Sequence, residues 1–274
     1  SHRGIFVINE LPDLQARIQV ALFNILQEGD IQIRGFKVRL PLEIQFVFTA
    51  NPEDYTNRGS IVTPLKDRID SQIITHYPKD IETSRIITHQ EAHIKAGQAE
   101  ITSNDLAKDL IEQIAFEARD SEYVDAKSGV SARLTISAYE NLMSAAERRS
   151  LINEEKVSVR ISDFYGLIQS SPCKVELVYE GEQEGPGIVA HNLVGKAIRT
   201  KFTEFFPDPE KLRKNKEAQN PYTKITDWFG DSNMLDLIHD ASNKAYEKAL
   251  DDVPGLGALV DKYVKNTDEH TRYF

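Results

Sequence analysis

Two short apolar runs near the start of the chain predict strands, and an amphipathic stretch between them predicts a helix. Residues 5–8 and 44–49 are almost wholly apolar, and such runs are typical of strands buried on both faces in a parallel sheet. Between them, apolar side chains recur at intervals of three and four, which predicts one helix packed on the sheet. Gly29 is its expected C-cap, and its apolar stripe consists of Leu14, Ile18, Leu22 and Ile25.

The stretch from residue 31 to residue 40 predicts a β-hairpin. Apolar and polar residues alternate on either side of Gly35-Phe36, which is the expected turn. One face of the hairpin is therefore expected to be apolar, and the other to be basic and to carry Arg34, Lys37 and Arg39.

From residue 81 onward, helical periodicity replaces the strand pattern. Asn104 has the side chain and the position expected of an N-cap. Four helices are predicted, over residues 81–97, 104–123, 128–152 and 160–171.

The last hundred residues are less regular. The pattern predicts a short strand over 174–179, a loop over 180–187 and a helix over 195–206. The Pro-bounded, charged stretch 207–221 predicts an exposed linker, and helices are expected after it. The predicted regions are thus an α/β core over 1–80, a helical region over 81–171 and a mostly helical region over 172–274.

Polar residues directly follow both predicted strands near the start. Asn9 and Glu10 come after the first strand, and Asn51 follows the second. Parallel strands deliver their carboxyl ends to one edge of a sheet, where ligands bind in open α/β folds. There Glu10 can polarise a water molecule, Asn51 can hold that water or a phosphate, and Asn9 can bind a water ligand of Mg²⁺. An acid after an apolar strand occurs in many folds, so an inert sheet edge is an equally good interpretation of these residues alone.

Composition narrows the classes of protein further. The 274 residues suggest one large domain or two to three smaller ones, and the content of 40% hydrophobic and 28% charged residues is ordinary for a globular protein. A net charge of −10 makes a nucleic-acid partner the weaker expectation, with the basic face of the hairpin as its one candidate contact. The single cysteine, Cys173, fits a reducing compartment. Because no apolar run approaches the ~20 residues of a membrane span, we expect a cytoplasmic protein.

Four consecutive blocks resemble one family. "RGIFVINELPDL", "LQEGDIQIRGFKVRLP", "FVFTANPEDY" and "TPLKDRID" are similar to blocks of the AAA+ ATPases, in the magnesium-chelatase ATPase-subunit and MoxR-like branch. The resemblance covers about residues 3–80, and the following helices more loosely. It implies the C-terminal part of an AAA+ P-loop NTPase core with a β-hairpin insertion before sensor 1. A helical lid and further helices then follow.

The resemblance also implies roles for particular residues. Glu10 matches the catalytic glutamate of the Walker B strand, and Asn51 matches sensor 1. Asn9 stands where the family usually has Asp, so we expect Mg²⁺ to be bound more weakly. ATP and Mg²⁺ are the implied cofactors, with Asn9 and Glu10 nearest the metal.

Three arginines match positions that contact phosphate in the family. Arg68 matches the arginine finger, which acts in trans on the neighbouring subunit, and Arg58 is a second candidate in the same loop. Arg133 matches the sensor 2 arginine of the lid. The alternatives are a surface ion pair between Asp67 and Arg68, and a helix-surface position for Arg133.

A phosphate-binding loop is missing from the expected place. The P-loop pattern Gly-x-x-x-x-Gly-Lys-Ser/Thr does not occur, and its nearest match, "AHNLVGKA" (190–197), lacks the first glycine and the hydroxyl. We interpret Gly195-Lys196 as the start of a helix. The sequence is therefore expected to be the downstream part of an AAA+ protein, inactive alone.

A second motif, "HQEAH", places His89 and His93 four residues apart, as in a zinc site. Its Glu stands one position later than in zinc proteases, and no third ligand is evident. Surface histidines on a polar helix are the better interpretation.

Two classes of function remain open. By resemblance, the parent protein is an ATPase that forms a hexameric ring and acts with a von Willebrand A domain partner or a client protein. It would drive metal insertion or remodel the client. The alternative is a non-catalytic oligomeric scaffold, which Asn9 and the missing loop favour.

Overall fold

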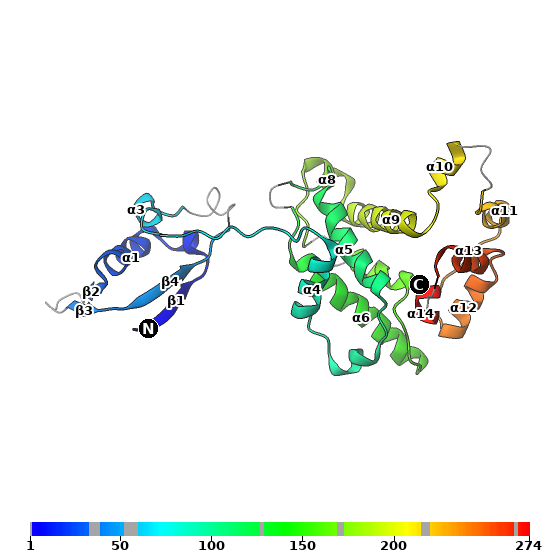
Figure 1. Cartoon of the computed structure of the whole chain (residues 1–274), viewed down its shortest axis with the longest axis horizontal. Helices are drawn as coiled ribbons and strands as arrows, with labels where there is room; N and C mark the ends of the chain where they lie inside the picture. The colour runs from blue at the N-terminus through cyan, green and yellow to red at the C-terminus, as the bar shows by residue number, and fades with distance from the viewer. Residues whose placement is uncertain are drawn as a thin grey trace. The chain divides into compact units, whose positions relative to one another are not determined.

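The computed structural model describes residues 2–32, 39–51, 60–126, 129–168, 173–214, 220–265 and 268–274. The chain divides into two compact units, Ser1–His76 and Tyr77–Phe274 (Figure 1). The first contains the strands, and the second is almost entirely helical. The chain is thus mostly helical with a small sheet near its start, in the α/β-then-α order that the sequence predicts.

In the first unit, the two predicted strands lie side by side and parallel. β1 (Gly4–Ile8) pairs with β4 (Ile44–Phe48) in a register that joins Gly4 to Ile44 and Ile8 to Phe48. The base of the predicted hairpin is also present, because β2 (Asp30–Gln32) pairs antiparallel with β3 (Arg39–Pro41). Arg39 of this hairpin is paired with Asp30 at 3.3 Å. The expected turn at Gly35-Phe36, with Arg34 and Lys37, lies outside the described residues.

The prediction that β1 is buried on both faces is wrong for the described structure. Ile5 and Val7 are 72% and 53% exposed on one face, and Phe6 on the other is 40% exposed. Phe6 packs edge-on against Phe46 of the neighbouring strand, with ring centroids 5.7 Å apart. An apolar run shows that its side chains favour burial. It does not show whether other elements of the chain cover both faces of the strand.

The predicted helix before the hairpin is confirmed as α1 (Ala16–Glu28). Gly29 closes it in the left-handed conformation, with φ 63°, where glycine has no steric penalty. Its polar residue Gln19 is buried, at 1% exposure. Its amide donates to the carbonyl oxygens of Leu14 and Ser60 and accepts from the Val62 N–H. This amide therefore holds the segment leading into α3 (Thr63–Lys66) against α1.

The second unit is built around α5 (Asp105–Arg119), which packs against α4 (Ile81–Glu91), α6 (Arg133–Asn153) and α9 (Pro186–Phe205). Asn104 caps α5 as predicted, since its side chain accepts the Ala107 N–H at 2.7 Å. The core includes Leu110, Ile111, Ile114, Leu142, Phe164, Leu193 and Ala197. Residues of α9 therefore share one core with α5 and α6.

Short elements cover the ends of this core. They are the 3-10 helices η2 (Ala96–Glu100) and η3 (Ile161–Phe164), and the helices α7 (Tyr165–Ile168) and α8 (Tyr179–Glu184). The predicted helix over 160–171 is thus η3 followed by α7, and residues 169–172 lie outside the described part. The predicted strand over 174–179 consists of two single bridges, Val124 to Leu177 and Val130 to Val175.

Two predictions about residues 180–205 are wrong. The expected loop over 180–187 is α8 and the first turn of α9, and α9 begins at Pro186, well before Gly195. Proline suits the first turn of a helix, because the amide that it lacks has no partner there. The P-loop-like stretch 190–197 therefore lies wholly within α9, where its amides are committed to the helix. Its Lys196 is paired with Glu117 at 2.9 Å.

Polar contacts attach the start of α12 (Asn243–Asp251) and the residues before it to the core. Arg148 and Asn153 of α6 bind Asp240, and Arg160 donates to the carbonyl of Ala241 and the side chain of Asn243. The predicted linker over 207–221 contains α10 (Pro209–Lys214), and residues 215–219 are not described. The last helices are α10 (Pro209–Lys214), α11 (Thr223–Gly230), α12 (Asn243–Asp251), α13 (Leu256–Tyr263) and α14 (Glu269–Arg272). Of the helices described, none has both the length and the apolar character needed to cross a bilayer.

Candidate functional site

The parallel pairing of β1 and β4 brings the predicted polar residues to one edge of the sheet. The backbone ladder continues past the strands, because Thr49 N–H donates to the Ile8 carbonyl and Leu11 N–H donates to the Thr49 carbonyl. The Glu10 N–H donates to Thr49 Oγ1 at 3.0 Å. Asn9 and Glu10 are therefore fixed next to the segment that carries Asn51.

The side chains at this edge form a small polar group. Asn51 Nδ2 lies 3.4 Å from Glu10 Oε2, and Thr49 Oγ1 lies 3.4 Å from Asn9 Oδ1. All four residues are exposed, so a ligand can reach them. Thr49 is a member that the sequence analysis missed, because it was assigned only to the strand. Its position two residues before Asn51 was the available signal.

Glu10 has a backbone conformation that L residues rarely adopt. Its φ of 52° and ψ of 55° lie in the left-handed region, which costs about 1–2 kcal/mol for a residue with a side chain. Leu11, which is fully buried, holds the following backbone in place through its bond to the Thr49 carbonyl. Strain of this kind persists only where the surroundings enforce it, and it is concentrated at functional sites.

The chemistry of the donors fits Mg²⁺ held through water. One carboxylate from Glu10 and the amide oxygen of Asn9 are oxygen ligands, and Mg²⁺ in proteins keeps several waters and needs only one or two carboxylates besides phosphates. The 274 residues do not contain a P-loop pattern, which is the usual site for binding the phosphates of a nucleotide. These residues therefore fit the metal better than they fit the phosphates of ATP.

The predicted arginine finger lies against α1. Arg68 donates to Gln27 Oε1 at 2.7 and 3.2 Å and to the Pro64 carbonyl, and its guanidinium lies 5.2 Å from the centre of the Phe23 ring. In the described part of the chain it forms no hydrogen bond or ion pair with Asp67, Glu10 or Asn51. The surface ion pair considered as its alternative is thus not formed.

The remaining candidates belong to the second unit or lie outside the described residues. Arg133 is the first residue of α6 in the second unit, where its side chain is exposed. Arg58 lies outside the described residues.

His89 is in the last turn of α4, whereas His93 follows the end of the helix, so the two do not share a helix face. Burial lowers the pKa of His89, and the described residues contain no group of three or more His, Cys, Asp or Glu side chains that could hold a metal.

Comparisons with known proteins add little to this geometry. No protein-family model matches the chain, and the search of curated proteins finds no match. Among solved structures, the chain is similar to the crystal structure of a provisionally assigned ATPase from Cytophaga hutchinsonii, with 18% identity and a TM-score of 0.27. The match covers 71% of this chain and 64% of that chain. At so low a TM-score, the likeness carries no argument about fold or activity.

Proposed function

We propose that this chain is the downstream part of an ATP-hydrolysing AAA+ motor of the magnesium-chelatase and MoxR-like type. The observation that carries the proposal is the edge of the parallel sheet, where Glu10 and Asn51 meet and Glu10 has a strained backbone. A carboxylate and an amide donor at adjacent strand ends are the groups that hydrolysis of a phosphoanhydride needs. The four sequence blocks described above supply the family.

In this proposal each residue has one task. The Glu10 carboxylate accepts a hydrogen bond from the attacking water and takes its proton, while the Asn51 amide donates to the same water or to a phosphate oxygen. Asn9 holds a water of the metal shell, and Thr49 keeps the Asn9 and Glu10 backbone in register. Mg²⁺, when bound, neutralises charge on the phosphate oxygens.

The proposed assembly is a hexameric ring in which Arg68 acts on the next subunit and Arg133 acts from the lid. For this role Arg68 gives up its contacts with Gln27 and Phe23 and binds phosphate oxygens instead. Charged phosphate oxygens attract a guanidinium more strongly than the neutral amide oxygen of Gln27 does. A client protein or a von Willebrand A domain is the proposed partner, and client remodelling or metal insertion is the proposed output.

The test is ATP turnover with and without the Glu10 carboxylate. The 274-residue chain alone is expected to show none, whereas the intact product of the gene is expected to hydrolyse ATP with Mg²⁺. Glu10→Gln in that intact protein is expected to lower turnover at least ~100-fold without changing its oligomeric state. Glu43→Gln is the control, because this exposed carboxylate precedes β4 at the opposite end of the sheet and pairs with Arg3. Full activity of Glu10→Gln would refute the proposal.

The alternative is a nucleotide-independent oligomeric scaffold. Two observations favour it, namely Asn9 in place of an acid and the attachment of Arg68 to α1. The same assay decides between the two, because a scaffold assembles identically with and without ATP and shows no turnover in either variant.

A further inference from the structure

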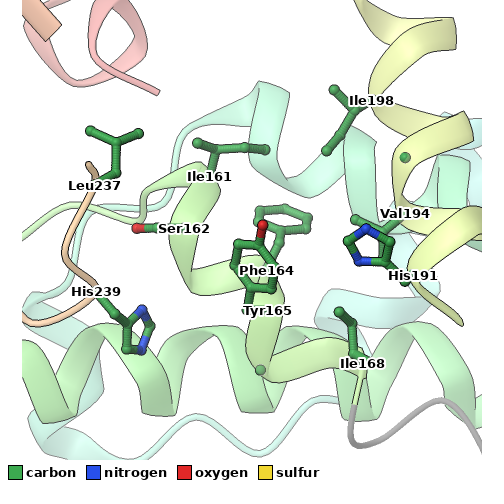
Figure 2. Close-up of a pocket in the computed structure, with 12 residues that line it drawn as sticks. Ile161, Ser162, Phe164, Tyr165, Ile168, His191, Val194, Ile198, Leu237 and His239 are labelled. Atoms are coloured by element: carbon green, nitrogen blue, oxygen red, sulfur yellow. The ribbon is translucent and has the colours of Figure 1, made fainter. Parts of the chain in front are cut away.

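The second unit contains a cavity that the proposed ATPase chemistry does not use. It has a volume of about 620 Å³ and lies between η3 with α7, one face of α9, and the stretch that carries Leu237 and His239 (Figure 2). Sites for small molecules are typically 300–1,000 Å³ in volume. Its apolar surface comes from Ile161, Phe164, Ile168, Val194 and Ile198.

One polar group in the wall of this cavity is without a partner. Ser162 is 7% exposed, and its Oγ is buried with no hydrogen-bond partner among the described residues. Figure 2 shows this hydroxyl pointing toward the stretch with Leu237 and His239. Leaving a buried hydroxyl unpaired forfeits its hydration without replacement, so native proteins usually satisfy such groups. Rotation of the Ser162 side chain about its Cα–Cβ bond to another staggered position can turn this hydroxyl into the cavity, where a polar group of a ligand can satisfy it.

Aromatic and imidazole rings occupy other parts of the wall. The Tyr165 ring stacks on the His191 ring, with centroids 6.3 Å apart and an interplanar angle of 28°. Both side chains are exposed, and His239 lies across the cavity (Figure 2). Stacked rings offer a flat surface of the kind on which another planar ring packs.

The wall formed by Leu237 and His239 is held by its neighbour. Asp240 accepts two hydrogen bonds from the Arg148 guanidinium, and its carbonyl accepts one from Asn153. Both donors belong to α6, so the stretch is tied to the helical core. The cavity is therefore formed before any ligand enters, which limits the entropy lost on binding.

We propose that this cavity binds a small planar aromatic molecule that carries a single hydroxyl or carbonyl group. The ring system lies on the apolar wall beside Tyr165 and His191, and the polar group exchanges a hydrogen bond with Ser162 Oγ. The proposal is independent of ATP hydrolysis, because no residue of this wall belongs to the edge around Glu10.

Two probes that differ only in the polar group test the inference. Naphthalene and 2-naphthol are titrated against the 274-residue chain, and their dissociation constants are measured by ligand-observed NMR. We expect 2-naphthol to bind about five- to tenfold more tightly, as one added hydrogen bond requires. In Ser162→Ala, naphthalene affinity is expected to stay the same and the preference for 2-naphthol to disappear.

A pair of glycine substitutions locates the binding site. Gly195 lines the cavity, and a Cβ built on it meets no atom within 4 Å, so Gly195→Phe can fill the space without a clash at its Cβ. Gly187 lies on the same helix, has equal room and does not line the cavity, so Gly187→Phe is the matched control. We expect binding of both probes to be lost in Gly195→Phe and retained in Gly187→Phe.

Several results would overturn the inference. They are failure of both probes to bind the unmodified chain, equal affinity for the two probes, and a preference for 2-naphthol that survives Ser162→Ala. Binding that persists in Gly195→Phe, or that is lost equally in Gly187→Phe, would place the probes elsewhere and have the same consequence. Thermal unfolding of each variant shows that the comparison is made on folded protein.

Discussion

Two neighbouring arginines on α6 have opposite environments. The side chain of Arg149 is 1% exposed and pairs with Asp163, which is fully buried and also accepts the Arg160 N–H. The side chain of Arg148 is 57% exposed and pairs with Asp240 at the surface. In a buried ion pair each charge has lost its water and depends on its partner, so removing one partner is costly. In an exposed pair water can solvate either charge almost as well, so the pair adds little to stability.

Arg149→Met is therefore expected to destabilise the second unit by about 3–5 kcal/mol, because it leaves the Asp163 carboxylate buried without its partner. The measurement is urea unfolding followed by helical circular dichroism. Arg148→Met removes a guanidinium from the next position of the same helix, and its unfolding midpoint should stay close to that of the unmodified chain. Equal losses in the two variants would contradict this account.

Glu112 makes a contribution to stability that depends on pH. Burial raises its pKa above the ordinary value of 4.5, although hydrogen bonds from Ser84 and Thr88 and the charge of Arg119 oppose the shift. The folded state therefore holds this proton more tightly than the unfolded state. The stabilising contribution is complete below the unfolded pKa and is lost as the pH rises through the folded pKa.

Replacing Glu112 with Gln should remove this dependence, because the amide stays uncharged and its oxygen can still accept from Ser84. As the pH falls from neutral to the range in which Glu112 takes up its proton, the unmodified chain should gain stability. We expect this gain to be smaller in Glu112→Gln. Unfolding free energies measured across that range test it. Asp105→Asn on the exposed first turn of α5 is the control, and an unchanged pH profile in Glu112→Gln would exclude Glu112 as the cause.

At the scale of elements, two glycines show how local space decides where helices form. A Cβ at Gly181 in α8 would lie 2.5 Å from the Tyr123 carbonyl oxygen, whereas a Cβ at Gly187 in α9 meets nothing within 4 Å. Gly181→Ala should therefore cost about 1–3 kcal/mol through overpacking. Gly187→Ala should stabilise by about 0.5–1 kcal/mol, because alanine favours a helix more than glycine does. Thermal unfolding of the two variants measures the contrast, and shifts of the same sign would count against it.

The same contacts explain which elements the sequence could predict. α1 and α5 each carry an apolar stripe and have a capping residue directly beside them in the sequence, so the local pattern was sufficient to predict both helices. α8 depends on Gly181 fitting under Tyr123, which is a contact between distant residues. Its glycine and its charged residues are typical of a loop, and only tertiary packing overrides this preference.

The candidate site divides in the same way. The meeting of Glu10 with Asn51 follows from parallel strands and was predicted from the order of elements. The left-handed backbone of Glu10 and the hold of Gln27 on Arg68 depend on contacts made after folding. Neither has a signature in the pattern of apolar and polar residues.

At the scale of the whole molecule, the two units are joined by a stretch without helix or strand. Residues 71–79 belong to no element, and Ile73 and Ile74 are 91% and 78% exposed. The second unit begins where Tyr77 donates to the Val130 carbonyl and lies under the Arg119 guanidinium.

Limited proteolysis is therefore expected to cut first between residues 70 and 76, and mass spectrometry should find a resistant fragment starting near Tyr77. A cut within α5 or α9 that precedes this one would contradict the division into units. The resistant fragment should unfold with the same midpoint as the second unit of the whole chain.

The exposed face of the sheet in the first unit has a consequence for the self-association of the purified protein in solution. In the described sheet of β1 and β4 each strand has one neighbour, so its outer edge is open to a further strand, and Ile5, Val7 and Val47 are exposed on one face. Such an edge is a template for strand addition. Purified chains should therefore associate, and the apparent mass measured by light scattering should rise with protein concentration. A charged residue introduced on the open face should reduce this association.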